Sequence, residues 1–156
     1  MGIHPYTFLP DTKVFQNRGT RAYEQHPQTL GEHIKKARMI KGLFQKSVAA
    51  LLNVSEDTIT YWENERTLPQ IHHYPAIISF LGYYPFCHET ESYAGKLKQI
   101  RYCMGLNIKQ CAALLQVSVD AVRRWQQGKP IANDIYKNLI LSAWKELSNQ
   151  LLQHPV

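Results

Sequence analysis

One stretch of this chain occurs twice, without a gap. Residues 45–64, QKSVAALLNVSEDTITYWEN, are matched 63 residues later by residues 108–127, IKQCAALLQVSVDAVRRWQQ. Core, turn and tryptophan positions are kept together, so the chain is predicted to contain one small helical unit twice. Over the windows 30–66 and 93–129 the identical pairs are Lys35/Lys98, Arg38/Arg101, Gly42/Gly105, Leu43/Leu106, Lys46/Lys109, Ala49/Ala112, Ala50/Ala113, Leu51/Leu114, Leu52/Leu115, Val54/Val117, Ser55/Ser118, Asp57/Asp120 and Trp62/Trp125.

The spacing inside each copy predicts two short helices joined by a tight turn. Apolar residues one helical turn apart share a helix face, and one further apolar residue fills the angle between the helices. Ser55 and Ser118 stand where the second helix needs a side-chain cap. Asn53 and Gln116 occupy a turn position that favours left-handed backbone, which asparagine tolerates better than glutamine. The apolar positions are Val48, Leu52, Val54, Ile59 and Trp62 in one copy and Cys111, Leu115, Val117, Val122 and Trp125 in the other.

These residues resemble the Cro/lambda-repressor-like, or XRE-type, helix-turn-helix family. The resemblance is carried by Arg38, Gly42-Leu43-Phe44-Gln45, Ala49, Asn53-Val54-Ser55 and Trp62-Glu63. It covers residues 29–86 in full and about 92–130 in a second copy. That copy departs from the pattern at Asn107, Ile108 and Gln126. The resemblance implies an all-α fold of two tandem helix-turn-helix domains, each able to place a helix in the major groove of duplex DNA.

The chain is accordingly divided into three parts. Residues 1–28 are expected to form an extended N-terminal arm, in which Arg18 and Arg21 follow a phosphate backbone or enter a minor groove, or alternatively a disordered leader. Residues 29–86 form the first predicted domain, with helices over 29–41 and 74–81 flanking the repeated pair. Thr29 is the predicted cap of the first helix, with Glu32 three residues on. Residues 87–156 form the second, ending in a long helix over 134–152.

That long helix carries two neighbouring apolar rows, broader than the closing of one small domain requires. We expect it to pack within the chain, or alternatively to pair two chains as a homodimer. The rows are Ile135, Leu139, Ala143, Leu147 and Leu151, and Tyr136, Ile140 and Trp144.

The net charge of +6 is unevenly distributed. Residues 30–66 contain six Lys and Arg against five Asp and Glu, whereas residues 93–129 contain seven against one. Essentially all the excess charge therefore lies on the second copy, where a polyanion would bind best. A solvated helical face is the alternative interpretation.

The resemblance also implies DNA-contacting residues, position by position. Arginine pairs with guanine, glutamine with adenine, and a carboxylate can accept from cytosine. Glu56 and Asp57 could instead serve only to complement the helix N-terminus. In the family pattern the helix-one arginine pairs with the glutamate after the tryptophan, so Arg38 should contact Glu63. Base-facing candidates are Gln45, Glu56, Asp57, Thr60 and Tyr61, and Val119, Asp120, Arg123 and Arg124, with Lys46 and Lys109 as phosphate contacts.

Other chemistry is not indicated. The chain lacks a paired-carboxylate motif, a phosphate-cradling glycine loop and a nucleophile with an identifiable base, so we expect no enzyme and no cofactor. Three cysteines without a CxxC motif favour neither a disulfide framework nor a zinc ribbon. The group His72, His73, Cys87 and His88 matches no defensible metal motif. No apolar run has the length of a membrane span, so a cytoplasmic location is expected, or a nucleoid-associated one in a bacterium.

The sequence therefore predicts a protein that binds double-stranded DNA sequence-specifically, as a transcriptional regulator. A protein-interaction module, antitoxin-like or adaptor, is the alternative, in which one degenerate copy serves as a docking surface. An accessory factor for recombination is a third, weaker hypothesis.

Overall fold

The computed structural model describes residues 26–86 and 91–153, with side chains described as far as Leu147. All regular elements in these residues are helical. The chain forms two compact units. One contains the described residues through Pro69 together with Ala76–Pro85, and the other contains Gln70–Pro75 and the described residues from Phe86 onward. The arm predicted over residues 1–28 lies almost entirely outside the described residues, and the boundary predicted after residue 86 stays a prediction.

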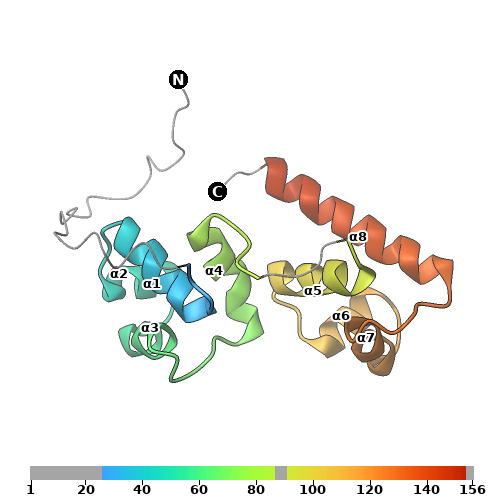
Figure 1. Ribbon diagram of the computed structural model, residues 1–156, viewed down its shortest axis with the longest axis horizontal. Helices are drawn as coiled ribbons and strands as arrows, with labels where there is room; N and C mark the ends of the chain where they lie inside the picture. Colours follow the sequence, from blue (N-terminus) through green and yellow to red (C-terminus); the bar gives the residue numbers. More distant parts are fainter. Residues whose placement is uncertain (1–25, 87–90, 154–156) are drawn as a thin grey trace. The chain divides into compact units, whose positions relative to one another are not determined.

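The N-terminal half contains α1 (Leu30–Ile40), α2 (Gln45–Leu52), α3 (Glu56–Glu63), a 3-10 turn η2 (Ile71–His73) and α4 (Tyr74–Leu81) (Figure 1). Thr29 caps α1 as predicted. Its hydroxyl accepts from the Glu32 amide, and the Glu32 carboxylate accepts from the Thr29 amide, both at 3.2 Å. After α1, Gly42 adopts a φ of 65°, and the chain then turns into α2.

The helices α1 and α3 approach each other with no side chain between them at Gly31. A Cβ atom on Gly31 would lie 2.0 Å from the carbonyl oxygen of Trp62. That oxygen belongs to the backbone of α3, so only glycine fits here without moving a helix. The sequence did not reveal this contact, because one glycine in a helical pattern has several explanations.

The core of the first unit includes four of the five predicted apolar positions, and the fifth, Val54, is partly buried against it. Ile34, Val48, Ile59 and Ile77 are fully buried. Lys41 closes α4 onto α1, because its ammonium group donates to the Phe80 carbonyl and lies 4.4 Å from the centre of the Phe80 ring. The remaining core residues are Ala37, Leu43, Ala49, Leu52, Trp62, Phe80 and Leu81, with Leu30 and Val54 partly buried against them.

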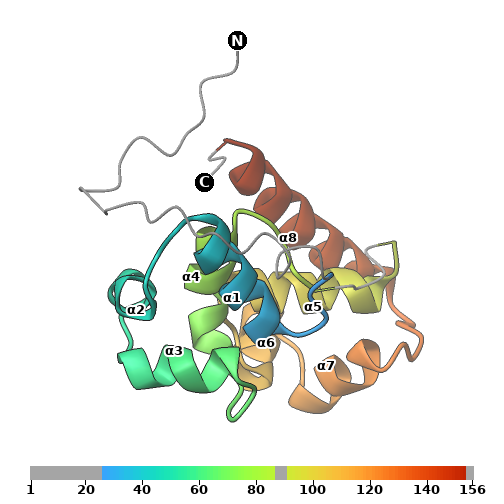
Figure 2. The ribbon, with the colours of Figure 1, turned by 60° about the vertical axis from the view of Figure 1, so that its left-hand side comes forward.

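The second unit contains α5 (Tyr93–Met104), α6 (Ile108–Leu114), α7 (Val119–Gln126) and α8 (Asp134–Gln153). Ser92 caps α5 by accepting from the Gly95 amide at 3.0 Å. The long helix α8 packs along α5, on the side away from α6 and α7 (Figures 1 and 2). The core is formed by Leu97, Ile100, Cys111, Ala112, Leu115, Val122, Trp125, Ile131, Ile140 and Leu147.

The two apolar rows of α8 have different environments. Tyr136, Ile140 and Trp144 pack on the core, whereas Ile135 and Leu139 are 64% and 40% exposed. In the row that begins at Ile135, Leu147 is buried while these two residues lie at the surface. The inward row is fixed by Trp144, whose indole N–H donates to Gln99 Oε1 at 2.8 Å while the Lys96 ammonium lies 5.0 Å from its ring.

Candidate nucleic-acid interface

The turn between α2 and α3 has the geometry predicted for a helix-turn-helix. Asn53 adopts left-handed backbone with φ 53°, and the Val54 amide donates to the Ala49 carbonyl at 2.9 Å. The Ser55 hydroxyl accepts from the Thr58 amide at 3.2 Å and so caps α3. Figure 2 shows α2 nearly end-on and α3 from the side, so the two helices cross at a steep angle. This arrangement leaves the first turn of α3 exposed at the surface.

A buried ion pair holds α3 against α1. The Arg38 guanidinium donates to both carboxylate oxygens of Glu63, from Nε at 2.6 Å and from Nη2 at 2.8 Å. The Glu63 side chain is only 1% exposed and that of Arg38 16%. The predicted contact is therefore present, as a bidentate pair, which is the strongest geometry for these two groups.

Gln45 extends this network toward the surface. Its amide nitrogen donates to Glu63 Oε2 at 2.9 Å, and its amide oxygen lies 3.1 Å from the Thr60 hydroxyl. The Thr60 hydroxyl lies equally far from the Glu56 carbonyl oxygen and can donate to either. Both ends of the Gln45 amide are thus engaged inside the protein, so Gln45 must exchange partners before it can bind a base.

The other candidates of the first unit lie at the surface. Lys46, Glu56, Asp57 and Tyr61 are exposed, Tyr61 at 42%. A hollow of about 430 Å³ beside them is lined by Arg38, Phe44, Gln45, Lys46 and Glu56. Glu56 and Asp57 occupy the first turn of α3, where a carboxylate complements the partial positive charge of the helix N-terminus and repels phosphates.

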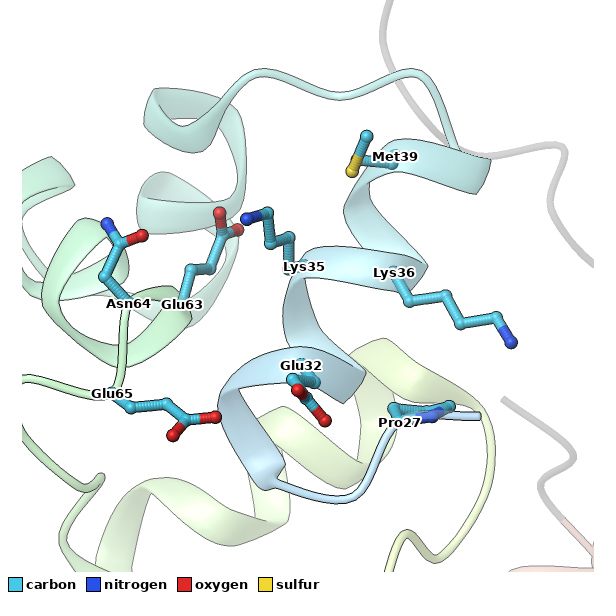
Figure 3. A pocket seen from close by; sticks show the side chains of 8 residues that line it. All are labelled: Pro27, Glu32, Lys35, Lys36, Met39, Glu63, Asn64 and Glu65. Carbon is cyan, nitrogen blue, oxygen red and sulfur yellow. The ribbon is translucent and has the colours of Figure 1, made fainter. Parts of the chain in front are cut away.

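A larger hollow, of about 570 Å³, lies away from this surface, between α1 and the end of α3 (Figure 3). Its carboxylates already have partners. Glu32 accepts from the Gln28 and Thr29 amides, which lowers the pKa of its carboxyl group, and Glu65 accepts from the Thr29 hydroxyl at 2.8 Å. In Figure 3 the Lys35 side chain points toward Glu63. The residues that line this hollow therefore help to hold the first unit together, and they form no evident site for a ligand.

The second unit repeats the turn. Gln116 adopts a φ of 53°, the Val117 amide donates to the Ala112 carbonyl at 2.9 Å, and Ser118 caps α7. Asn107 and Gln110 form a capping box at the start of α6. The departure of Asn107 from the family pattern therefore preserves the helix start.

Arg101, the half-buried arginine that corresponds to Arg38, has a neutral partner. Arg101 donates to Gln126 Oε1 at 2.7 Å and to the Leu106 carbonyl at 3.2 Å. The Gln126 amide nitrogen is buried and has no hydrogen-bond partner among the described residues. An amide thus replaces the carboxylate of the first unit, leaving the charge of Arg101 uncompensated and one donor unsatisfied.

The candidates of the second unit differ in exposure. Lys109 and Arg124 are exposed, and Arg123 forms a 3.0 Å ion pair with Asp120, with side chains 57% and 82% exposed. An exposed pair of this kind contributes only a few tenths of a kcal/mol (about 0.3) and yields readily to another partner. Val119 is half-buried against the core, so much of its side chain serves packing.

Other sites considered from the sequence have little support. Burial raises the pKa of the Cys103 and Cys111 thiols to about 11, so both are protonated at neutral pH. No group of three metal-ligating side chains occurs within residues 26–86 and 91–153, and Cys87 and His88 lie outside the described residues. In that same part of the chain, no helix has the length and apolar character needed to cross a membrane.

Three structural contacts were not foreseen: the Gly31 crossing, the Gln45–Thr60 hydrogen bond, and an aromatic cluster of Tyr74, Phe86 and Tyr102. In this cluster the Tyr74 and Phe86 rings stack at 5.1 Å and the Phe86 and Tyr102 rings meet edge to face at 4.7 Å. Gly31 had one available signal, because the equivalent residue of the second copy is Ala94.

Comparison with known families gives one match. Residues 34–86, roughly a third of the chain, match the helix-turn-helix family model. The matched region ends at Phe86 and gives the second repeat no family assignment. Comparison with curated proteins and with solved structures gives no significant match.

Proposed function

We propose, on the premise that residues 34–86 form an XRE-type helix-turn-helix domain of a kind that typically binds DNA and is not enzymatic, that this chain binds double-stranded DNA sequence-specifically and regulates transcription. The observation that carries the proposal is the exposed first turn of α3, set by the Asn53 turn and the Ser55 cap. Such a function belongs in the cytoplasm, or at the nucleoid of a bacterium.

In this proposal α3 enters the major groove with its N-terminal residues against base edges. Lys46 meets a phosphate beside the groove. Tyr61 faces the bases from the exposed side of α3, and Gln45 and Thr60 join it when their mutual hydrogen bond opens. Glutamine can then hold an adenine through two hydrogen bonds.

The two acidic residues of α3 allow a sharp test. If Glu56 and Asp57 accept from cytosine amines, Glu56→Gln and Asp57→Asn should weaken preference at single base pairs. If they only repel phosphates, both variants should bind all duplexes more tightly. Glu146→Gln, an exposed change of the same charge on α8, controls for net charge. The preferred duplex is first selected from a random pool, and failure to select any consensus would contradict sequence-specific binding.

We further propose that residues 92–130 are a diverged second copy of the domain. The proposal is supported by the repeated sequence, the repeated left-handed turn at Gln116 and the Ser118 cap. It places Val119, Asp120, Arg123 and Arg124 on the face of α7 that corresponds to the proposed DNA-binding face of α3.

A protein-interaction module is the second candidate. It is favoured by the exposed acidic turn of α3 and by Ile108, which stands where the first unit has Gln45. Binding to random duplexes over a salt series separates the two functions, because a DNA-binding protein loses affinity steeply with salt and an interaction module hardly binds.

The homodimer considered from the sequence remains a proposal. The exposed residues Ile135 and Leu139 lie one turn apart on α8 and would form its contact. Sedimentation of the full chain and of Ile135→Gln/Leu139→Gln tests it: a dimer that the variant converts to monomer supports the proposal, and a monomeric parent chain contradicts it.

A further inference from the structure

The surface formed by α6, α7 and the turn after α7 is cationic. Lys109, Arg123, Arg124 and Lys129 are exposed there, and Asp120 is the one carboxylate within residues 93–129. Asp120 pairs with Arg123. Among the described residues, no ion pair joins Lys109, Arg124 or Lys129 to a carboxylate.

The repeat shows how this charge arises. Three carboxylates of the first unit, Glu56, Glu63 and Glu65, stand at the positions of Val119, Gln126 and Gly128 in the second. Thr60 and Tyr61 stand at the positions of Arg123 and Arg124. The two copies therefore share a backbone arrangement and differ in five charges. Three of these differences, at Val119, Arg123 and Arg124, fall on the face of α7 and favour a polyanion there, whereas Glu63 is buried and Glu65 lines the hollow beside α1.

We infer that the α6–α7 surface of the second unit is a second binding surface for duplex DNA, which holds phosphates through Lys109, Lys129 and one of the two adjacent arginines. It supplies most of the affinity that does not depend on sequence. The inference rests on the proposed function, which it deepens by assigning the sequence-independent part of binding to a region that the family match does not reach.

The α6–α7 surface has no exposed aromatic ring, which favours duplex DNA over single-stranded nucleic acid as its ligand. Proteins that hold single strands offer aromatic side chains on which bases stack. Trp125 is the only aromatic residue of α6 and α7, and it is 8% exposed and packs in the core. Stacking of bases on aromatic side chains is therefore not available here, whereas phosphate contacts are, and a duplex presents phosphates in a regular array.

The test measures binding of the full chain to a random-sequence duplex by fluorescence anisotropy over a salt series. Each lost phosphate contact should reduce the slope of log K against log salt by about 0.9. We expect about that change for Lys109→Gln and about twice it for Lys109→Gln/Lys129→Gln. Lys145→Gln removes the same charge from exposed α8 in the same unit and should leave the slope unchanged.

Four outcomes count against the inference. If the parent chain binds duplexes and the double variant keeps its slope, the inference fails and the proposed function stands. Tighter binding of single-stranded RNA than of duplex, lost in the double variant, rejects the duplex assignment. If the parent chain binds no duplex at low salt, both proposals fail. The conservative variant Lys109→Arg/Lys129→Arg should retain the slope, and equal loss in it would show that folding rather than charge is responsible.

Discussion

At one repeat position the first unit places Glu63 against Arg38, and the second places Gln126 against Arg101. The first arrangement is a neutral, bidentate pair that also binds Gln45. The second holds its guanidinium with one amide oxygen and one backbone carbonyl, and leaves an amide donor unsatisfied. The same backbone therefore supports two electrostatic solutions. In the first unit the pair ties α3 into an internal network, whereas in the second unit the guanidinium has no carboxylate partner.

The largest effect on stability should come from the close approach of α1 and α3 at Gly31, whose equivalent in the second unit is Ala94. We expect Gly31→Ala to lower the free energy of unfolding by about 3 kcal/mol, because the new Cβ would displace the Trp62 carbonyl oxygen and hence α3. Ala94→Gly in the second unit should cost at most about 1 kcal/mol, the usual helix penalty. Urea denaturation measures both, and equal losses would mean that the crossing relaxes without strain.

The next prediction compares the loss of the partner residue of Arg38 with the loss of the partner residue of Arg101. Glu63→Ala leaves the Arg38 guanidinium without its carboxylate, whereas Gln126→Ala removes a neutral partner. We expect the former to cost more by about 1 to 3 kcal/mol. Thermal unfolding of the two variants should show the larger shift for Glu63→Ala, and equal shifts would contradict the difference in partner charge.

The arginines of α7 offer a test of base reading by the second unit. Adjacent helical residues differ by about 100° in direction, so one of Arg123 and Arg124 should reach a guanine while the other meets phosphate. We expect Arg123→Ala or Arg124→Ala to relax preference at one guanine position by about 1 to 3 kcal/mol. Each variant is measured against the preferred duplex and its single-base changes at fixed salt. A uniform loss for both variants would make the second unit a sequence-independent clamp only.

The hydrogen bonds of Gln45 allow a test of whether the first unit determines the sequence preference. Gln45→Ala removes the hydrogen-bond partner of Thr60 and one donor to Glu63. We expect the selected DNA consensus to change, with a loss of about 1 kcal/mol in stability. Ile108→Val, at the equivalent position, should leave the consensus intact. An unchanged consensus for Gln45→Ala would remove Gln45 from the specificity of the first unit.

The smallest effect is a gain. Gln126→Glu restores the carboxylate of the first unit opposite Arg101 and removes the unsatisfied donor. We expect stability to rise by up to about 1 kcal/mol at neutral pH, because the new carboxylate would face the half-buried guanidinium of Arg101. Glu63→Gln, the reciprocal change, should lower it. Calorimetry of the pair checks the signs, and a loss for both variants would mean that the two sites are not equivalent.

Local patterns predicted much of the first unit. The Thr29 capping box, the Ser55 cap and the left-handed Asn53 depend on residues within four positions of one another, and the sequence displays them directly. The contact of Arg38 with Glu63 spans 25 residues and came from the family pattern. Contacts between helices without such a pattern were not predictable.

The orientation of α8 illustrates this limit. Both of its rows are apolar, so periodicity alone could not choose between them. The choice depends on Gln99 and Lys96 of α5, which bind Trp144 from 45 and 48 positions away in the chain. Prediction of the candidate DNA-binding residues of the first unit was limited in the same way, because the Gln45–Thr60 hydrogen bond depends on how two helices cross.

Two cysteines make the second unit a reporter of its own opening, because Cys111 is buried and Cys103 is partly buried against the core. The chain has cysteines only at positions 87, 103 and 111, so residues 26–86 contain none. Burial raises the pKa of both thiols to about 11, so Cys103 and Cys111 are protonated at pH 8. Alkylating reagents should therefore modify them chiefly when α5 or α6 transiently separates from the core. The rate of their modification, followed by mass spectrometry, would show whether bound DNA slows the transient opening of the second unit.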